Sequence, residues 1–256
     1  MPTPDATSLI ELPPGSLVIA DLHLDAVGPG AESDSFRRFL ASIRGAPCLL
    51  VLGDLFDAWI GPSQCELAAA RRVVEALRER VAQGTRVECL VGNRDFLLER
   101  RFEAASGARV HRGGVSARIG GERVLFVHGD ELCTLDHAYQ RMKRVLRSAP
   151  MLWGVPRLPR FVALACARRL RRASVRAVAA KPPASKAQQT EEAVRLAREA
   201  GCATLVCGHA HEFRDEVAGG VRWIVLDAFG GPRDLLRVGA SGALEVAASS
   251  DLSARP

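Results

Sequence analysis

Apolar runs alternate with amphipathic segments through the first hundred residues of the chain. Short, largely apolar runs at 17–20, 48–52 and 87–91 predict three buried strands. Between them, apolar residues recur at helical spacing over 36–43 and 67–81, which predicts two amphipathic helices. Strands that alternate with helices in this way pair in parallel, with the helices as crossovers. We therefore predict a parallel sheet in this part of the chain.

The pattern changes beyond residue 110. Gly120-Gly121 separates two short strand-like runs, which predicts a hairpin that feeds a second sheet. A helix is expected over 191–200 and a strand over 203–207, and further antiparallel strands are expected between 217 and 238. The tail from residue 248 is small and polar, and we expect it to be frayed.

The segment between residues 135 and 187 has a helical pattern interrupted by prolines and a distinctive charge. From Arg141 to Arg176 it carries eleven basic residues and no acidic one. The whole chain has a net charge of +6, yet the residues outside this stretch comprise 24 basic and 29 acidic side chains, a balance of −5. The basic charge therefore belongs to one insertion, and this insertion is the part expected to meet an anionic partner.

Five short polar motifs follow apolar runs, and they contain four of the six histidines of the chain. Active groups of open α/β sheets gather beyond the carboxyl ends of the strands, where the first three motifs fall. Their Asp, Asn and His side chains offer the oxygen and nitrogen ligands that divalent metals prefer. The motifs are Asp21-Leu22-His23, Gly53-Asp54, Gly92-Asn93-Arg94-Asp95, His128-Gly129-Asp130 and Gly208-His209-Ala210-His211.

The motifs predict a centre for two metals, which together can clamp a phosphate and activate water. Asp54 is the expected bridging carboxylate, because it is central and follows a glycine that lets backbones approach closely. An extended backbone would point the two ligands of Asp-x-His, and of His-x-His, in the same direction. Outside the motifs, His111 is expected to be structural and His137 to be a solvated helix residue. One metal would be held by Asp21, His23 and His211, and the other by Asn93, His128 and His209.

These motifs resemble the five blocks of the calcineurin-like metallophosphoesterase superfamily. Within it, the stretches at 20–24, 53–61, 92–98 and 128–134 resemble the family of UDP-2,3-diacylglucosamine hydrolases of lipid A synthesis. The resemblance spans residues 16 to 240. It implies an α/β fold, a four-layer αββα sandwich, in a single domain over 1–256 that carries a helical cap at 135–187.

The resemblance also implies site roles and cofactors. Two Mn²⁺ ions are the implied cofactors, and Asp95 and Asp130 are implied to orient the metal ligands. The catalytic residues would be Asp54, Asn93, Arg94 and His128. The substrate, a UDP-linked diacylglucosamine lipid, would be contacted by Asn93, Arg94, Asp136, Tyr139, Lys186 and His209. The sequence departs from the family at Ala179, Ala180, Pro182 and Pro183, where a polar run is usual before the lysine.

Arg94 stands where most phosphoesterases of the superfamily have a histidine that protonates the leaving group. An arginine stays charged and cannot donate a proton at neutral pH. A phosphate leaving from a pyrophosphate departs as a stable anion, so Arg94 favours pyrophosphate cleavage over hydrolysis of alkyl monoesters. The alternative is a structural pair between Arg94 and Asp95.

Composition narrows the remaining classes. The first residues lack the pattern of a signal peptide, and apolar runs such as 161–167 are too short to span a bilayer, so a cytoplasmic protein is expected. Seven cysteines without CxxC spacing argue against a disulfide framework or a zinc–thiolate site. The cap has three aromatic residues and no evident stacking platform, so nucleic acid is not expected as a partner.

The cap also bears apolar residues among its basic ones, which predicts docking to a membrane surface. The expected protein is therefore a monomer located peripherally on the cytoplasmic face of the inner membrane. A divergent phosphodiesterase or nucleotide pyrophosphatase with a soluble substrate remains the alternative, and a helical pair that only stabilises the core remains the alternative role of the cap.

Overall fold

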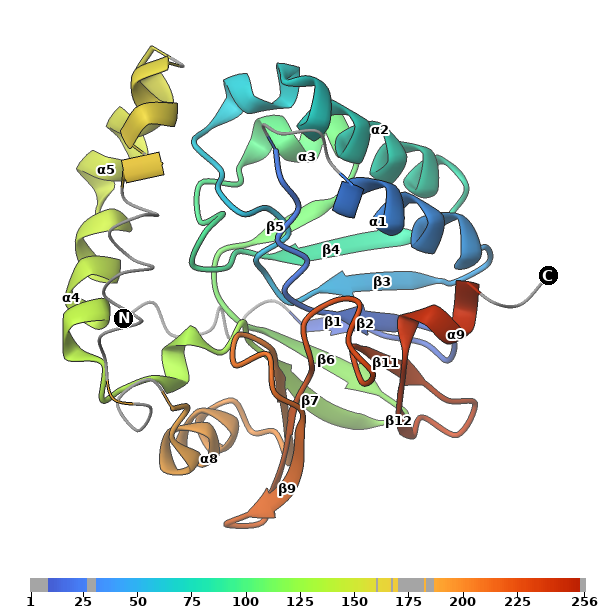
Figure 1. Ribbon diagram of the computed structural model, residues 1–256. Coiled ribbons are helices and arrows are strands. Elements are labelled where there is room, and N and C mark those ends of the chain that lie inside the picture. Colours follow the sequence, from blue (N-terminus) through green and yellow to red (C-terminus); the bar gives the residue numbers. More distant parts are fainter. Residues whose placement is uncertain are drawn as a thin grey trace.

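The computed structural model of the chain describes residues 9–26, 31–159, 161–166, 168–169, 182 and 187–253. Its strands form two six-stranded sheets, and helices cover the outer face of each (Figure 1).

Sheet I has the strand order β12-β11-β2-β3-β4-β5. Its strands β2 to β5 pair in parallel, while β11 runs antiparallel to β2 and β12 antiparallel to β11. The predicted parallel sheet and its two crossover helices are therefore confirmed. The strands are β2 (Leu17–Ile19), β3 (Cys48–Val51), β4 (Arg86–Leu90), β5 (Arg109–His111), β11 (Leu235–Val238) and β12 (Leu244–Ala247); the helices are α1 (Ala31–Ser42), η1 (Pro62–Glu66), α2 (Ala68–Ala82) and α3 (Arg100–Ser106).

Sheet II has the strand order β1-β6-β7-β8-β10-β9. The hairpin predicted at Gly120-Gly121 joins β6 to β7, and a second hairpin joins β9 to β10. Strand β8 lies between β7 and β10 and is parallel to both. The elements are β1 (Leu9–Glu11), β6 (Val115–Ile119), β7 (Glu122–Phe126), η2 (Asp130–Leu132), α8 (Thr190–Glu199), β8 (Thr204–Cys207), β9 (Arg214–Ala218) and β10 (Val221–Val225).

Three apolar layers hold this arrangement together, as expected when each sheet must bury both faces. The layer between the sheets includes Leu50 and Phe126. A second layer joins sheet I to α1, α2 and α3 through residues such as Phe36 and Leu77, and a third joins sheet II to α8 around Trp223. The order helix, sheet, sheet, helix is the αββα sandwich that the family resemblance implied.

The cap begins with α4 (His137–Leu146), α5 (Ala149–Gly154) and η3 (Val155–Arg157), and residues 161–166 are also helical. Figure 1 shows α4 and α5 along one side of the sandwich, away from α1. Leu152 and Val155 pack against the apolar layer of sheet I, so the cap is seated on the sandwich. Much of 170–186 lies outside the described residues, including Lys186.

Two features of the fold differ from the sequence prediction. The tail is not frayed from residue 248, because α9 (Ser249–Ser253) follows β12 and Ser249 is bound to the buried carboxylate of Asp234. The strands β1, β5 and β12 and the helix α3 were not predicted. Strands β1 and β5 have three residues each, too few to establish a period.

Candidate metal centre

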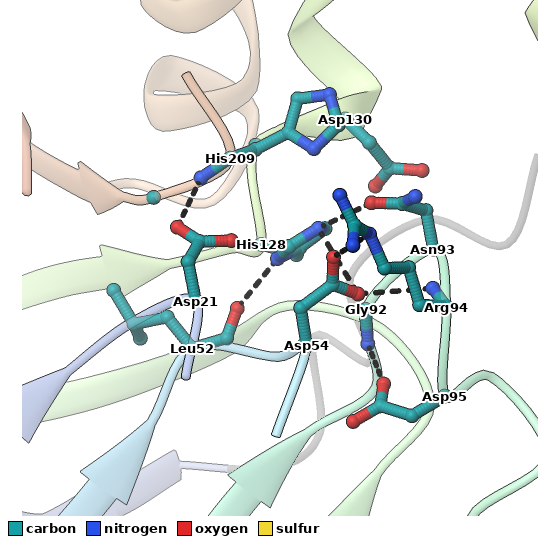
Figure 2. A network of polar contacts seen from close by, with 12 residues as sticks. Asp21, Leu52, Asp54, Gly92, Asn93, Arg94, Asp95, His128, Asp130 and His209 are labelled. Carbon is teal, nitrogen blue, oxygen red and sulfur yellow. Dashed lines mark hydrogen bonds and ion pairs between the residues drawn. The ribbon is translucent and has the colours of Figure 1, made fainter. Parts of the chain in front are cut away.

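The polar motifs converge where β2, β3, β4, β7 and β8 end (Figure 2). Sheet I supplies Asp21, Asp54 and the Asn93 loop, and sheet II supplies His128 and His209. The backbone pairing of β2 with β3 continues into the motifs, because the His23 amide donates to the Asp54 carbonyl at 2.9 Å. The two sheets therefore share one edge at which their motifs face each other.

The backbone at this edge is strained at the positions of expected metal ligands. Among the described residues, the non-glycine residues with positive φ are Asp21, His23, Asp54, His209 and His211, with φ between 50° and 70°. Such a conformation costs on the order of 1–3 kcal/mol per residue and gathers at functional sites. All five are expected metal ligands. The extended backbone expected for Asp-x-His and His-x-His is wrong, because a left-handed turn places each of these ligands.

Glycines allow the strand ends to come this close. A Cβ on Gly92 would lie 2.0 Å from Asp54 Oδ1 and 2.3 Å from the Asp54 backbone nitrogen. A Cβ on Gly208 would lie 2.3 Å from Asp21 Oδ2, and one on Gly53 would lie 2.8 Å from His128 Nδ1. Gly92, Gly208 and Gly53 thus each leave room for an expected ligand of a different motif.

Gly92→Ala is therefore expected to disrupt the centre. The backbone of Asp54 would have to move, and overpacking of this kind costs about 1–3 kcal/mol. Melting temperature and Mn²⁺ stoichiometry would be measured, and we expect a lower melting temperature and the loss of at least one Mn²⁺. Gly154→Ala is the matched control, because nothing lies within 4 Å of its Cβ position. Two Mn²⁺ bound to Gly92→Ala with wild-type stability would contradict the close approach.

Asp21, His23 and His211 form the first site. Their ligand atoms lie within 4.8 Å of one another. Nε2 of His23 lies 3.0 Å from Nε2 of His211, and the latter lies 3.6 Å from Asp21 Oδ1. Two imidazole nitrogens and a carboxylate oxygen therefore face a common position.

Asn93, His128 and His209 surround the second site. Nε2 of His128 lies 3.0 Å from Asn93 Oδ1, and the rings of His128 and His209 are 5.0 Å apart at their centroids. Nδ1 of His128 is 2.8 Å from the Leu52 carbonyl, to which it donates, and this leaves Nε2 free for a metal.

The Asp54 carboxylate lies between the two sites. Its Oδ2 is 3.7 Å from His23 Nδ1, and its Oδ1 is 3.8 Å from His128 Nε2. Asp21 also contacts both sides, since it groups with His23 and His211 and, separately, with Asp54 and His128. The geometry therefore provides two carboxylates for a pair of metals.

An independent observation also indicates that these donor atoms suit metal ions. Among the described residues, Asp21 Oδ1 and His23 Nδ1 are buried and have no hydrogen-bond partner. Buried polar atoms without partners are rare and call for an explanation such as an ion. Carboxylate, amide and imidazole ligands without thiolate suit Mn²⁺-like or Zn²⁺-like metals.

Protonation also favours metal binding. Burial and the charge of Arg94 lower the pKa of His23 to about 3, and burial and His128 lower the pKa of His209 to about 4. Both rings are therefore neutral at pH 7, with a lone pair free. Burial raises the pKa of Asp54 to about 7, and although burial alone would lower the pKa of His128, Asp54 and Asp21 raise it to about 9. A metal that binds between them displaces a proton.

Arg94 lies beside the centre and is held by two carboxylates. Its Nη1 is 2.8 Å from Asp57 Oδ1, and its Nε is 3.4 Å from Asp54 Oδ2. The structural pair with Asp95 is not formed. Asp95 instead accepts the amide of Gly92 at 2.7 Å and the amide of Leu55 at 2.8 Å, so it joins the second and third motifs. Asp57 was not predicted from the sequence, although it follows Asp54 by only three residues.

Asp130 connects the centre to the cap. Lys143 Nζ lies 2.8 Å from Asp130 Oδ2, and the Tyr139 hydroxyl donates to the same oxygen. Burial opposes ionisation of Asp130, but the charges of Lys143 and His128 hold its pKa well below the usual range. Arg147 donates to the Gly92 carbonyl at 3.0 Å. Lys143 and Arg147 were missed because their partners lie far away in the sequence.

The other residues considered in the sequence are not among the groups described above. Asp136 caps α4 by accepting the Tyr139 amide at 3.0 Å. His137 is exposed at the start of α4, and His111 pairs with the buried Glu88 at 2.7 Å. Lys186 lies outside the described residues.

The chain is similar to known phosphoesterases. Residues 16–213 match the family described as Calcineurin-like phosphoesterase. UDP-2,3-diacylglucosamine hydrolase of Pseudomonas aeruginosa is 38% identical over 199 residues, which cover 76% of this chain and 81% of the relative. The hydrolase of the same name from Azotobacter vinelandii is 38% identical over 197 residues, covering 77% and 81%, and that from Pseudomonas syringae pv. tomato is 38% identical, covering 76% and 78%.

Proposed function

This chain belongs to the calcineurin-like phosphoesterase family, and we propose that it hydrolyses the pyrophosphate of UDP-2,3-diacylglucosamine in lipid A biosynthesis. The products are UMP and 2,3-diacylglucosamine 1-phosphate. Support comes from relatives that carry this activity in their name and share 38% of their residues over most of both chains.

The observation that carries the proposal is the position of Arg94. Its guanidinium is fixed by Asp57 and lies 3.4 Å from the carboxylate between the two sites. It can neutralise charge on a phosphate held at the metals but cannot protonate a leaving oxygen. A phosphate anion leaves without that proton, so this residue suits a pyrophosphate better than an alkyl ester.

We propose Mn²⁺ in both sites, bound by the first-site and second-site residues and by Asp54. Bound there, the two ions would polarise the phosphate and supply a hydroxide nucleophile at neutral pH. Asn93 and His128, whose side chains lie 3.0 Å apart, would orient the phosphate at the second site. Arg94 stabilises the negative charge that develops on the phosphate oxygens.

We propose further that Asn93, Arg94 and His209 contact the head group of the substrate. Asp136 and Tyr139 support these contacts through α4, since Asp136 starts the helix and the Tyr139 phenol is fixed by Asp130. Lys186, near the end of the cap, completes the proposed contacts.

The cap is proposed to dock on the membrane that holds the lipid. Of the eight large hydrophobic side chains that are most exposed among the described residues, six lie between residues 135 and 161. Trp153 and Phe161 are 66% and 75% exposed, and Arg157 stacks on the Trp153 ring at 4.3 Å. Apolar groups among arginines are what an anionic lipid surface attracts. In the described part of the chain, no helix has the length and apolar character to cross a bilayer.

Neutralising four cap arginines is expected to weaken binding to anionic vesicles. Glutamine would replace Arg141, Arg144, Arg168 and Arg169. Since each basic residue near such a surface contributes about 1 kcal/mol, we expect a loss of roughly 100-fold or more in a vesicle sedimentation assay. The control replaces four exposed arginines of α1 and α2, namely Arg37, Arg38, Arg71 and Arg78. Equal binding of the two variants would remove the docking proposal.

The substrate is tested by comparing UDP-2,3-diacylglucosamine with a soluble UDP-sugar that lacks the acyl chains. We expect UMP release from the acylated substrate to be much faster. Equal rates on both would leave the metal centre in place and favour the nucleotide pyrophosphatase alternative.

A further inference from the structure

Gln188 lies buried immediately after the cap and before α8, outside every motif. Only 6% of it is exposed, although it is a polar residue. Its neighbour Gln189 donates its amide to the Leu132 carbonyl at 2.9 Å, so this part of the chain is bound to η2.

The side chain of Gln188 joins two metal-ligand loops. Its Nε2 donates to the Gly208 carbonyl at 2.9 Å and to the Gly129 carbonyl at 3.2 Å. Gly129 directly follows His128, and Gly208 directly precedes His209. A single carboxamide nitrogen therefore connects the backbones beside two ligands of the second site.

The surroundings explain why a glutamine amide occupies this position. Two carbonyl oxygens face the same atom, so that atom must be a donor. The side-chain oxygen of Gln188 faces the Cys207 thiol at 3.9 Å. A Cβ on Gly129 would lie 2.5 Å from Gln188 Nε2, so the contact also requires glycine at this position, where φ is 116°.

We propose that Gln188 is a positioning residue that sets the spacing of His128 and His209 and thereby the affinity of the second metal. This inference rests on the proposed two-metal centre. The His128 carbonyl also accepts a hydrogen bond from the Gly208 amide at 2.9 Å, so the two loops are already joined by their backbones. The side chain of Gln188 adds a second connection between the same loops. Without Gln188 Nε2, each carbonyl keeps only a backbone donor from its own loop, Leu132 for Gly129 and Ala210 for Gly208, so the side-chain bond that joins the two loops is lost and they can separate. The first site takes Asp21 and His23 from sheet I and only His211 from one of these loops, so it keeps most of its support.

The test is a Mn²⁺ titration of the full chain by calorimetry, with electron paramagnetic resonance to distinguish coupled pairs from single ions. Gln188→Met keeps the length of the side chain and removes the donor. We expect the tighter class of site to be unchanged and the second Mn²⁺ to bind about 10- to 100-fold more weakly, as for other groups that orient metal ligands. The spectrum of the coupled pair should be replaced by that of a single ion at moderate Mn²⁺.

Gln140→Met is the matched control. Gln140 is also buried, and its Nε2 also donates to two carbonyls, those of Asp130 at 3.0 Å and Cys133 at 3.1 Å. Neither residue is an expected metal ligand, so this variant should lose comparable stability and still bind two Mn²⁺. Gln188→Leu, which also lacks the donor, is expected to show the same selective loss and serves if the methionine variant fails to fold.

Three outcomes decide the inference. Selective weakening of one Mn²⁺ in the Gln188 variants, with the control unaffected, supports it. Two Mn²⁺ bound with wild-type affinity by folded Gln188→Met overturns it while the metal centre stands. A wild-type chain that binds fewer than two Mn²⁺ overturns both the metal centre and the inference.

Discussion

Asp54→Asn is expected to lower UMP release by at least about 1,000-fold. The carboxylate lies between both sites, and its oxygens are 3.7 Å and 3.8 Å from ring nitrogens of His23 and His128. Asparagine keeps the size and one acceptor oxygen but loses the charge that both metals would share. Metal ions supply several kcal/mol of transition-state stabilisation, and each 1.36 kcal/mol is tenfold in rate, so losing one ion accounts for about that factor.

This loss of activity should come from the loss of metal ions and not from unfolding of the variant. Mn²⁺ stoichiometry should fall from two to one or none, while the melting temperature of the metal-free variant should not fall, because a carboxyl group whose pKa is raised by burial has been replaced by a neutral amide. Asp215→Asn is the control, since Asp215 pairs with Arg222 on the surface and a surface pair contributes about 0–1 kcal/mol. Substantial activity of Asp54→Asn with two bound Mn²⁺ would show that this carboxylate does not bridge the metals.

Arg94→Ala is expected to lower kcat/KM for pyrophosphate cleavage by about 100- to 1,000-fold, the usual effect of removing one group that stabilises transition-state charge. Metal binding should persist, because Arg94 is not an expected ligand. Arg94→Lys keeps the charge but not the planar fork that also binds Asp57, so we expect it to recover only part of the rate. Rates and Mn²⁺ titrations would be measured together.

Arg101→Ala is the control for Arg94→Ala, since Arg101 pairs with Glu66 at an exposed position. Wild-type kcat/KM in Arg94→Ala would contradict the proposed role. A simultaneous loss of Mn²⁺ would instead make Arg94 a support for Asp54, whose carboxylate it approaches at 3.4 Å.

The sequence predicted the fold because its signals are local. The runs at 17–20 and 48–52 have no polar break, and helical spacing between them requires crossovers, so the parallel sheet followed. The αββα arrangement came from family resemblance, and it is confirmed by the three apolar layers. The α9 helix was not predicted because its anchor, the Asp234 carboxylate, is fifteen residues away from Ser249.

The expected metal ligands gather at one edge of the sheets, but their backbone geometry could not be predicted from spacing. Positive φ at Asp21 or His211 is imposed by the neighbouring loops, since an isolated chain disfavours it. The alternative considered for Arg94, a pair with its sequence neighbour Asp95, also came from spacing alone, while the fold provides Asp57. Gln188 belongs to no motif, and its role depends on two carbonyls that only the fold brings together.

The most direct test is UMP release from UDP-2,3-diacylglucosamine by the purified protein, measured with Mn²⁺ and again with EDTA. The proposed function predicts rapid release with Mn²⁺ that stops with EDTA and returns when Mn²⁺ is restored. No release with Mn²⁺, from a protein that binds two Mn²⁺ and cleaves another phosphoester, would contradict it and assign the metal centre to a different substrate.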